Sequence, residues 1–358
     1  MKANFNQRGT GVEKAVILTV ACLLISNFPV FAAVTPEKII AEKSSAEPVV
    51  IMLQPGVTGD DIQSALNSLP DSGGEVVLPA GTLSIRQPIV LHRDFQTLRG
   101  AGATTVLRLA DDANCPVIIM GEPVNNPKQT VREVCVRDLF IDGNRAHQQR
   151  ELWHFAGEGN EIRNNGITVQ GVCDSLVRNV TTTECRSGGL VTTREVRRLT
   201  VRGLESFGNE FDGLACYQTE DCLFADLNLH DNPGAGISLD LAFNHNVISN
   251  AVLNANDLGV FMRSSRENQF HNVSIQNSRH NGVFMAHAVM ATESGLRPAP
   301  KTECTYNSFT NLIAENCGGA AFRVNDTTCT NNVLIRAKFD GSHHGGVSEA
   351  QPDLVMMR

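Results

Sequence analysis

Three ionisable side chains follow one another at a constant interval in the sequence, namely Tyr217, Asp240 and Arg263. Together they could transfer a proton and stabilise the charge that its removal leaves. Proton removal beside a uronate carboxylate needs a cation that neutralises this carboxylate as negative charge develops. It also needs a base next to the carbon, and an acid that protonates the departing oxygen or the opposite face of the carbon. A phenol, a carboxylate and a guanidinium supply such groups, and a second carboxylate, Asp212, lies nearby. We therefore predict Tyr217, Asp240, Arg263 and Asp212 as catalytic residues.

The same residues also allow structural interpretations. Asp240 and Arg263 could form an ordinary cross-strand ion pair, which contributes about 0.5 kcal/mol. Asp212 could be a turn residue, because aspartate tolerates tight corners. A base role for Tyr217 requires a nearby cation to lower a phenol pKa that is ordinarily about 10. At the level of the sequence, the catalytic and the structural interpretations both stay open.

The interval between these side chains belongs to a longer repeat. Glycines that each begin a short apolar segment recur with nearly the same spacing, at Gly166, Gly189, Gly213, Gly236, Gly259 and Gly282. A period of about 23 residues is typical of a solenoid, and each unit is too short for paired helices. Alternating apolar residues bounded by Asn, Gly and Asp indicate strands and corners. The repeat therefore predicts an all-β fold, a parallel β-helix in which each unit is one coil.

Alternation along each strand also predicts which residues face the core. The third residue after each repeat glycine should point inward, and the fourth should point outward. Neighbouring coils stack about 4.8 Å apart. Tyr217, Asp240 and Arg263 are all fourth residues. We therefore expect them to form one file on the outer surface of the stack.

Two insertions interrupt the repeat, at residues 145–163 and near 288–303. Insertions in a solenoid project from one face, which is often the binding face. The first contains Trp153, whose indole could stack on a sugar ring or pack within its own loop. Arg194 begins a basic cluster that could hold an anionic polymer or be a solvated surface. We predict these substrate-binding residues: Trp153, His154, Arg194, His280 and His287.

The segment 1–32 resembles a secretory signal peptide. Lysine and arginine precede an apolar run, and small residues mark a cleavage site near Ala32. The run is too short for a permanent membrane span. We therefore expect a secreted or periplasmic protein with a signal peptide at 1–32, a linker at 33–48, a β-helix at 49–346 and a C-terminal tail at 347–358.

A short helix is predicted at the start of the β-helix. In "DDIQSALNSL" the apolar residues follow a helical period, and Asp60 or Asp61 is the expected N-cap. The end coil of a β-helix otherwise presents an unpaired edge and an open core. We expect this helix to cap the N-terminal end of the stack.

The composition limits the classes of partner. The chain has 358 residues, a formal net charge of −8 and ten cysteines. Nucleic-acid-binding proteins present a basic surface, so we expect no nucleic-acid partner for this acidic chain. No CxxC pair and no His–Cys spacing indicates a zinc site, and we predict no metal ligands. A solenoid grows by adding coils, so we expect one elongated domain, and a monomer.

The coils from about residue 50 to 346 resemble the pectate-lyase-like superfamily of right-handed parallel β-helix proteins. Within it, the segment "FDGLACY…HDNPGAGISLD…NANDLGVFM" is similar to the catalytic region of mannuronan 5-epimerases. That family carries Asp-Pro-His after Tyr-Gly-Phe, and a second catalytic aspartate about one coil later. Phe211 and Asp212 match the Phe and the first Asp, and Asp240 matches the second. The resemblance implies a right-handed β-helix and catalytic roles for both aspartates.

The family motif is incomplete in this chain. Gly213 replaces its proline, Leu214 its histidine and Asn209 its tyrosine. Tyr217 could take the place of the missing tyrosine in space. Lyases of the superfamily often use calcium, so the resemblance allows calcium as a cofactor, although no acidic cluster in the sequence marks a site for it.

Together, these features predict a secreted protein that acts on an acidic polysaccharide, by lyase or 5-epimerase chemistry on a uronate-containing glycan. Two alternatives stay open. A glycoside hydrolase of the same fold needs neighbouring outward carboxyl groups, for which Asp212 and Asp240 are the candidates. A non-catalytic β-helix that binds glycan or packs in the cell envelope agrees with the missing motif residues.

Overall fold

The structure is a computed structural model. It describes residues 49–148, 162–287, 303–349 and 355–357. The expected signal peptide and linker, residues 1–48, lie outside the described residues, as do the central parts of both insertions. The described residues belong to one compact unit, Pro48–Arg358. Among them, no helix has the length and apolar character that crossing a membrane requires.

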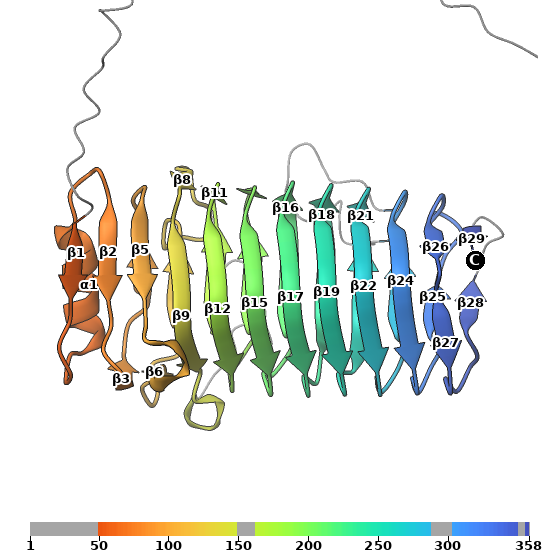
Figure 1. Ribbon diagram of the computed structural model, residues 1–358, viewed down its shortest axis with the longest axis horizontal. Helices are drawn as coiled ribbons and strands as arrows, with labels where there is room; N and C mark the ends of the chain where they lie inside the picture. Colours follow the sequence, from red (N-terminus) through yellow and green to blue (C-terminus); the bar gives the residue numbers. More distant parts are fainter. Residues whose placement is uncertain (1–48, 149–161, 288–302, 350–354, 358) are drawn as a thin grey trace, which may run out of the picture. The chain divides into compact units, whose positions relative to one another are not determined.

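The chain winds into a parallel β-solenoid of about eleven turns, whose strands stack side by side along its long axis (Figure 1). The described residues form two sheets of 15 and 14 strands, called sheet A and sheet B below. The β-helix predicted from the glycine repeat is confirmed.

The strands of sheet A are β1 (Val50–Met52), β2 (Gly74–Val77), β3 (Gly81–Ile85), β5 (Gln96–Arg99), β6 (Thr105–Leu109), β9 (Cys135–Asp142), β12 (Leu176–Thr183), β15 (Thr200–Phe207), β17 (Leu223–His230), β19 (Val247–Asn254), β22 (Gln269–Gln276), β24 (Ser308–Glu315), β26 (Val333–Ile335), β27 (Lys338–Asp340) and β29 (Val355–Met357). The strands of sheet B are β4 (Ile89–Leu91), β7 (Ile118–Met120), β8 (Val131–Arg132), β10 (Ile167–Gln170), β11 (Val172–Cys173), β13 (Leu190–Thr193), β14 (Val196–Arg197), β16 (Leu214–Glu220), β18 (Ala235–Asn244), β20 (Leu258–Arg263), β21 (Ser265–Arg266), β23 (Val283–Ala286), β25 (Phe322–Val324) and β28 (Val347–Glu349). The helices within the described residues are α1 (Gly59–Ser68) and the 3₁₀ helices η2 (Gly102–Thr104) and η3 (Arg145–His147).

The core lies between the two sheets and contains the residues that alternation predicts. On sheet B, the third residue after each repeat glycine is fully buried, as Val169, Leu239 and Met285 show. On sheet A, the buried rings of Phe270 and Phe309 stack with their centroids 4.3 Å apart. Each such side chain contributes about 1.5–3 kcal/mol by leaving water, so every added coil extends one continuous core.

Sheet A bends where its residues tolerate left-handed backbone. Asp138, Asn179, Gly203, Asp226 and Asn250 follow one another along the stack, with φ between 50° and 66°. The Nδ2 atom of Asn179 donates to Oδ1 of Asp138 at 2.9 Å, and that of Asn250 donates to Asp226 at 3.0 Å. Most L-residues are strained in this region. This explains why the sequence places glycine or a small polar residue about ten positions before most repeat glycines.

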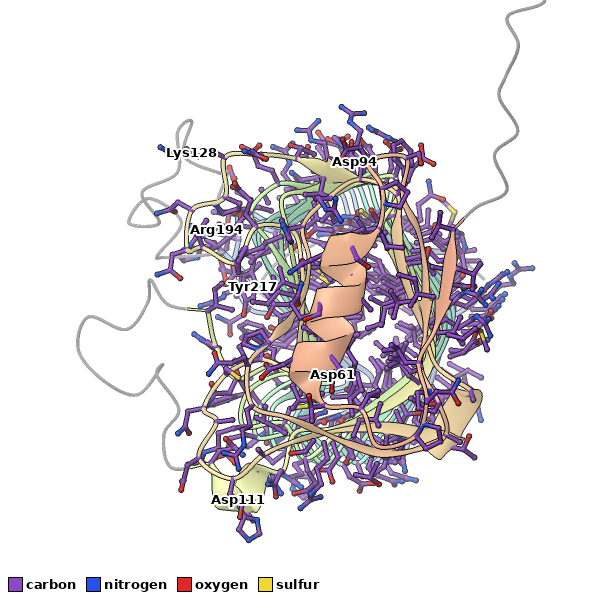
Figure 2. All side chains as sticks on the ribbon, turned by 90° about the vertical axis from the view of Figure 1, so that its left-hand side faces the viewer. Asp61, Asp94, Asp111, Lys128, Arg194 and Tyr217 are labelled. Carbon is purple, nitrogen blue, oxygen red and sulfur yellow. The ribbon has the colours of Figure 1, made fainter. Side chains whose placement is uncertain are left out.

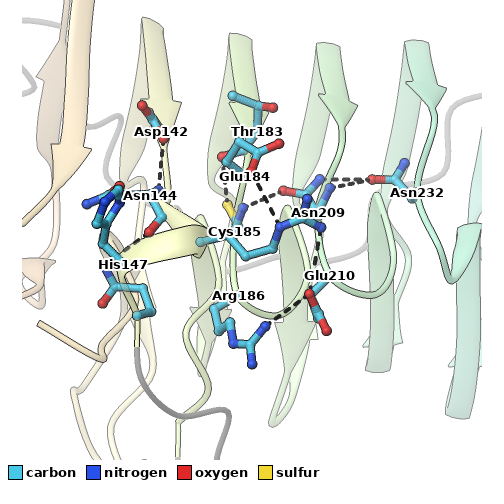
Figure 3. A network of polar contacts seen from close by, with 12 residues as sticks. Asp142, Asn144, His147, Thr183, Glu184, Cys185, Arg186, Asn209, Glu210 and Asn232 are labelled. Atoms are coloured by element: carbon cyan, nitrogen blue, oxygen red, sulfur yellow. Dashed lines mark hydrogen bonds and ion pairs between the residues drawn. The ribbon is translucent and has the colours of Figure 1, made fainter. Parts of the chain in front are cut away.

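A second ladder of asparagines is buried at the corner between the sheets. Asn209 Nδ2 donates to Asn232 Oδ1 at 3.0 Å, and Asn232 Nδ2 donates to Asn256 Oδ1 at 2.9 Å. Asn209 also accepts a hydrogen bond from the backbone of Cys185 at 3.1 Å, as Figure 3 shows. Because buried amides and backbone groups need partners, this ladder holds neighbouring coils in one register.

The first insertion leaves the stack beside this ladder, through η3. Arg145 forms ion pairs with Glu184 at 3.4 Å and Glu210 at 3.7 Å. Arg186 also reaches Glu210, at 3.2 Å, as Figure 3 shows. These contacts attach the start of the insertion to the two following coils. The chain returns at residues 162–165, directly before β10.

Helix α1 lies across the N-terminal end of the stack, as the end-on view in Figure 2 shows. It buries Ile62 and Leu66 against the first coils. Thr58 is the N-cap: its backbone donates to Asp61 Oδ2 at 2.8 Å, and the backbone of Asp61 donates to Thr58 Oγ1 at 3.4 Å. The predicted capping helix is confirmed, but the predicted aspartate N-cap is wrong, because Asp61 supplies the reciprocal half of a capping box.

Strand pairing continues beyond residue 346. Strand β28 pairs with β25, and β29 pairs with β26. Parts of segment 347–358, which we expected to be a tail, therefore extend both sheets.

Candidate functional site

A file of side chains on the outer surface of sheet B contains three of the four predicted catalytic residues. Tyr217 in β16 and Asp240 in β18 are register partners. Arg263 ends β20 and follows Met262, the register partner of Leu239. The guanidinium therefore lies beside the carboxylate of the preceding coil.

The backbone bends directly after this file. Gln218 has φ 49°, and Leu241 and Ala242 have φ 50° and 72°. These two residues of β18 oppose the single Gln218 of β16, so β18 contains a β-bulge just after Asp240. Left-handed backbone costs a non-glycine residue roughly 1–2 kcal/mol. Bulges are over-represented next to active sites, where they redirect side chains.

Asp240 is held from two sides. Arg263 Nη2 donates to its Oδ2, and the backbone of Leu241 donates to its Oδ1 at 2.8 Å. The side chain of Asp240 is only 6% exposed, whereas that of Arg263 is 36% exposed. Burial raises the pKa of Asp240, against the opposing charge of Arg263. Arg263 Nε is buried and has no hydrogen-bond partner within the described residues.

Asp212 lies at the corner before β16. Its Oδ1 accepts a hydrogen bond from the backbone of Ala235 at 2.7 Å. Burial raises the pKa of Asp212 to about 6, although this hydrogen bond and the charge of Arg163 act in the opposite direction. A carboxyl group that titrates near neutrality is suited to general base catalysis.

The phenol of Tyr217 differs from the Asp212 carboxyl group in its protonation state at neutral pH. Burial raises its pKa, and the negative charge of Asp212 raises it further. The cations Arg163 and Arg263 do not reverse this shift. The phenol therefore stays protonated at neutral pH, which favours an acid role over the base role that the sequence also allowed.

Arg163 belongs to this cluster, and the repeat pattern did not mark it. Its charge lowers the pKa values of both Asp212 and Tyr217, so its guanidinium is within electrostatic range of both side chains. It is the last charged residue of the first insertion, two residues before Asn165 and the return to the stack. A cation at the return point of an insertion is the signal that could have identified it.

Arg194 lies on the same side of the stack as Tyr217, as Figure 2 shows. It directly follows Thr193, which neighbours Tyr217 in the file, and it is half-buried. Its backbone donates to Gln218 Oε1 at 2.9 Å. The structure thus brings one of the predicted substrate-binding residues close to the file.

The two histidines predicted to bind substrate each have a carboxylate partner. His280 Nδ1 lies 2.8 Å from Asp257 Oδ1, at the corner before β23, and its side chain is 68% exposed. His287 directly follows β23, and its Nδ1 lies 2.5 Å from Asp326 Oδ1. Neither histidine is a member of the file. Trp153 and His154 lie outside the described residues.

The fold and the file define a parallel β-helix protein with a partly buried polar cluster on one outer face. The sequence matches the family model described as periplasmic copper-binding protein (NosD) over residues 137–340. This match covers more than half of the chain, and the chain therefore belongs to the NosD family. A comparison with curated proteins found no match.

Three solved structures illustrate the similarity of fold. ORF18 of Geobacillus virus E2 has a TM-score of 0.64 at 14% identity, over 84% of this chain and 60% of that chain. The N-terminal fragment of bacteriophage phi29 gene product 12 has a TM-score of 0.60 at 14% identity, over 84% and 54%. The A-module of mannuronan C-5 epimerase AlgE4 from Azotobacter vinelandii has 0.53 at 15% identity, over 84% and 95%. At such identities the likeness concerns the fold alone.

The family description raises the question of a copper site. Copper in proteins is held by sets of imidazole, thiolate and thioether groups. Within the described residues, no three His, Cys, Asp or Glu side chains lie together in a way that could hold a metal ion. The thiols of Cys185 and Cys216 are buried, and burial raises their pKa values, which disfavours the thiolate that binds metal. The residues that the structure describes therefore do not form a copper site with three such ligands.

Proposed function

We propose that this protein is a secreted or periplasmic enzyme that acts on a uronate-containing polysaccharide by lyase or 5-epimerase chemistry. One observation carries the proposal: Tyr217, Asp240 and Arg263 are neighbours on the outer face of sheet B. Asp212, whose pKa burial raises to about 6, lies within electrostatic range of the Tyr217 phenol and of Arg163. The family description as periplasmic supports the location, and the epimerase among the similar folds supports the substrate class.

In the proposed reaction, Arg263 and Arg163 bind the carboxylate of the uronate and neutralise the charge that develops on it. Asp240 positions Arg263 through its hydrogen bond, and the side chain of Arg263 is partly exposed to a ligand. Asp212 is ionised at neutral pH and takes the proton from carbon five.

Tyr217 acts as the acid in both the lyase reaction and the epimerase reaction. In a lyase, the electron pair of the broken C–H bond forms a double bond between carbons four and five. The bond from carbon four to the glycosidic oxygen then breaks, and Tyr217 protonates this oxygen. In an epimerase, Tyr217 returns a proton to carbon five from the opposite face, which inverts the configuration and leaves the polymer intact.

A glycoside hydrolase is the second candidate. It is favoured by the presence of two carboxyl groups with raised pKa values, Asp212 and Asp240, on one face. Hydrolysis needs one carboxylic acid and one carboxylate on either side of the glycosidic bond. The contact of Asp240 with Arg263 weakens this candidate, because that carboxyl group already has a guanidinium partner.

The test is a panel of polyuronates incubated with the mature protein in heavy water, with and without added calcium. An unsaturated uronate identifies a lyase, and deuterium at an inverted carbon five identifies an epimerase. Reducing ends without unsaturation identify a hydrolase. Absence of turnover on every polymer overturns the proposed chemistry and leaves a non-catalytic β-helix.

A further inference from the structure

A stacked pair of phenylalanines lies on the outer face of sheet B, one in the coil of Arg263 and one in the next coil. Phe261 in β20 and Phe284 in β23 are register partners. Their ring centroids are 5.7 Å apart and their planes differ by 5°. Both side chains are half-buried, whereas Met262 and Met285, which follow them, are fully buried in the core. The two rings therefore form an outward-facing apolar surface that extends over two coils.

A guanidinium lies against each ring. The Cζ atom of Arg263 is 4.9 Å from the centroid of Phe261, and that of Arg323 is 5.9 Å from the centroid of Phe284. Arg323 in β25 is the register partner of Phe284. Both distances are within the range of cation–π attraction. The two rings and Arg323 thus form a second column on the same face as the file, since the register partner of Arg263 in the file itself is Ala286.

The two cations differ in their partners. Arg263 donates to the carboxylate of Asp240. Arg323 is exposed, and its Nη2 donates to the neutral amide oxygen of Asn325 at 3.0 Å. Within the described residues, no carboxylate forms an ion pair with Arg323, so its positive charge is available to an anion.

This combination matches one kind of ligand. The faces of the two rings are covered by each other and by the two guanidiniums, so their outward edges form an apolar strip on the surface. The C–H face of a pyranose ring can pack against such an apolar strip. A carboxylate on the sugar can take two parallel hydrogen bonds from a guanidinium. The coils of Arg263 and Arg323 are two steps apart, or roughly 10 Å. A polyuronate that runs along the stack can therefore place one carboxylate at each arginine and pack a sugar ring against the phenylalanine edges between them.

We propose that Phe261, Phe284 and Arg323 form a binding subsite for a uronate residue next to the one that reacts. This subsite rests on the proposed function, because it assumes that the polysaccharide crosses the file at Arg263. The subsite makes binding depend on the length of the ligand. A disaccharide fills the reaction centre alone, whereas a longer oligosaccharide also reaches Arg323.

The experiment measures binding and turnover of uronate disaccharides and hexasaccharides with the full mature chain. Phe284→Leu and Arg323→Gln should each weaken hexasaccharide binding at least tenfold and change disaccharide binding less than twofold. Phe284→Tyr retains the ring and should retain the affinity. Phe207→Leu is the matched control, because Phe207 stacks on His230 on sheet A, with centroids 4.8 Å apart. Thermal unfolding of each variant separates lost binding from lost folding.

The outcomes for the subsite and for the proposed function differ. If the wild-type protein turns over the polymer while both variants bind the hexasaccharide normally, the subsite is overturned and the function stands. If turnover is absent but the variants lose hexasaccharide binding, the subsite stands as a glycan-binding surface and the chemistry fails. If the wild-type protein neither binds nor converts any uronate, both are overturned.

Discussion

An Arg–Asp pair from successive coils occurs on the outer face of each sheet, but the two pairs differ in burial. On sheet A, Arg202 Nε lies 2.9 Å from Asp226 Oδ2, and the side chains are 58% and 45% exposed. On sheet B, Arg263 contacts Asp240, and the exposures are 36% and 6%. The same residue types at nearly the same spacing therefore form a solvated pair on one face and a shielded pair on the other.

The polar side chains around the two pairs differ in burial in the same way. On sheet A, polar side chains pair with one another in the open, as Asn228 and Glu205 do at 3.1 Å. On sheet B, Asp212 and Tyr217 are shielded enough for burial to raise both pKa values. Shielded groups change their proton affinity and respond strongly to a bound charge, whereas solvated groups do not. This difference is why we assign the chemistry to sheet B.

The largest expected effect separates the aspartates of the two faces. Asp212→Asn retains an oxygen that accepts from Ala235 but removes the base, so kcat on the uronate polymer should fall roughly 10³-fold. Asp226→Asn on sheet A should leave kcat within twofold. Initial rates by nuclear magnetic resonance measure both. Equal rates in the two variants would contradict the assignment.

Removal of the acid should have the next largest effect. Tyr217→Phe deletes the hydroxyl group and should lower kcat about 10²-fold with little change in KM, because proton transfer contributes at least this factor. The chain contains two tyrosines, and the other, Tyr306, is 56% exposed. Tyr306→Phe is therefore the matched control and should retain full activity. A Tyr217→Phe variant with normal kcat removes Tyr217 from the mechanism.

The two arginines should differ in their effect on folding. Arg263→Ala leaves Asp240 buried without its cation and should lower the free energy of unfolding by about 2 kcal/mol, less than a fully buried pair because Arg263 is partly exposed. Arg202→Ala breaks a solvated pair and should cost less than about 1 kcal/mol. Urea unfolding at neutral pH compares them. Similar losses in both variants would show that the two faces are shielded alike.

The smallest expected effect is a pH dependence of stability. The folded-state pKa of Asp212 is about 6, above the ordinary aspartate value, so the folded protein binds this proton more tightly than the unfolded chain. This group therefore lowers the free energy of unfolding as pH rises from about 4 to about 6, by about 1–2 kcal/mol for a partly shielded carboxyl. Asp212→Asn should lack this decrease. Parallel stability curves for the variant and the wild-type protein argue against the shift.

The sequence predicted the fold and the register closely, because both depend on a repeat. Left-handed corners at Asn179 and Gly203 need residue types that the sequence displays, and buried third positions such as Leu239 need apolar ones. The repeat interval correctly placed Tyr217 beside Asp240, since register partners in a parallel stack are one period apart.

The shielding of the site could not be predicted in the same way. Arg163 reaches the cluster from an insertion, which has no period to align it. The bulge at Leu241 and Ala242 adds one residue to β18, but another part of the same coil is one residue shorter. The spacing between the repeat glycines therefore does not reveal the bulge. Whether an outward aspartate is solvated, like Asp226, or shielded, like Asp240, depends on neighbouring coils rather than on its own position in the repeat.

The most direct test is the titration of the Asp212 carboxyl carbon by nuclear magnetic resonance, with Asp212→Asn used to assign the signal. Shielding on sheet B predicts a midpoint near pH 6 in the folded protein. A midpoint near 4, the ordinary value for a solvated aspartate, would contradict the shielded cluster on which the proposed chemistry depends.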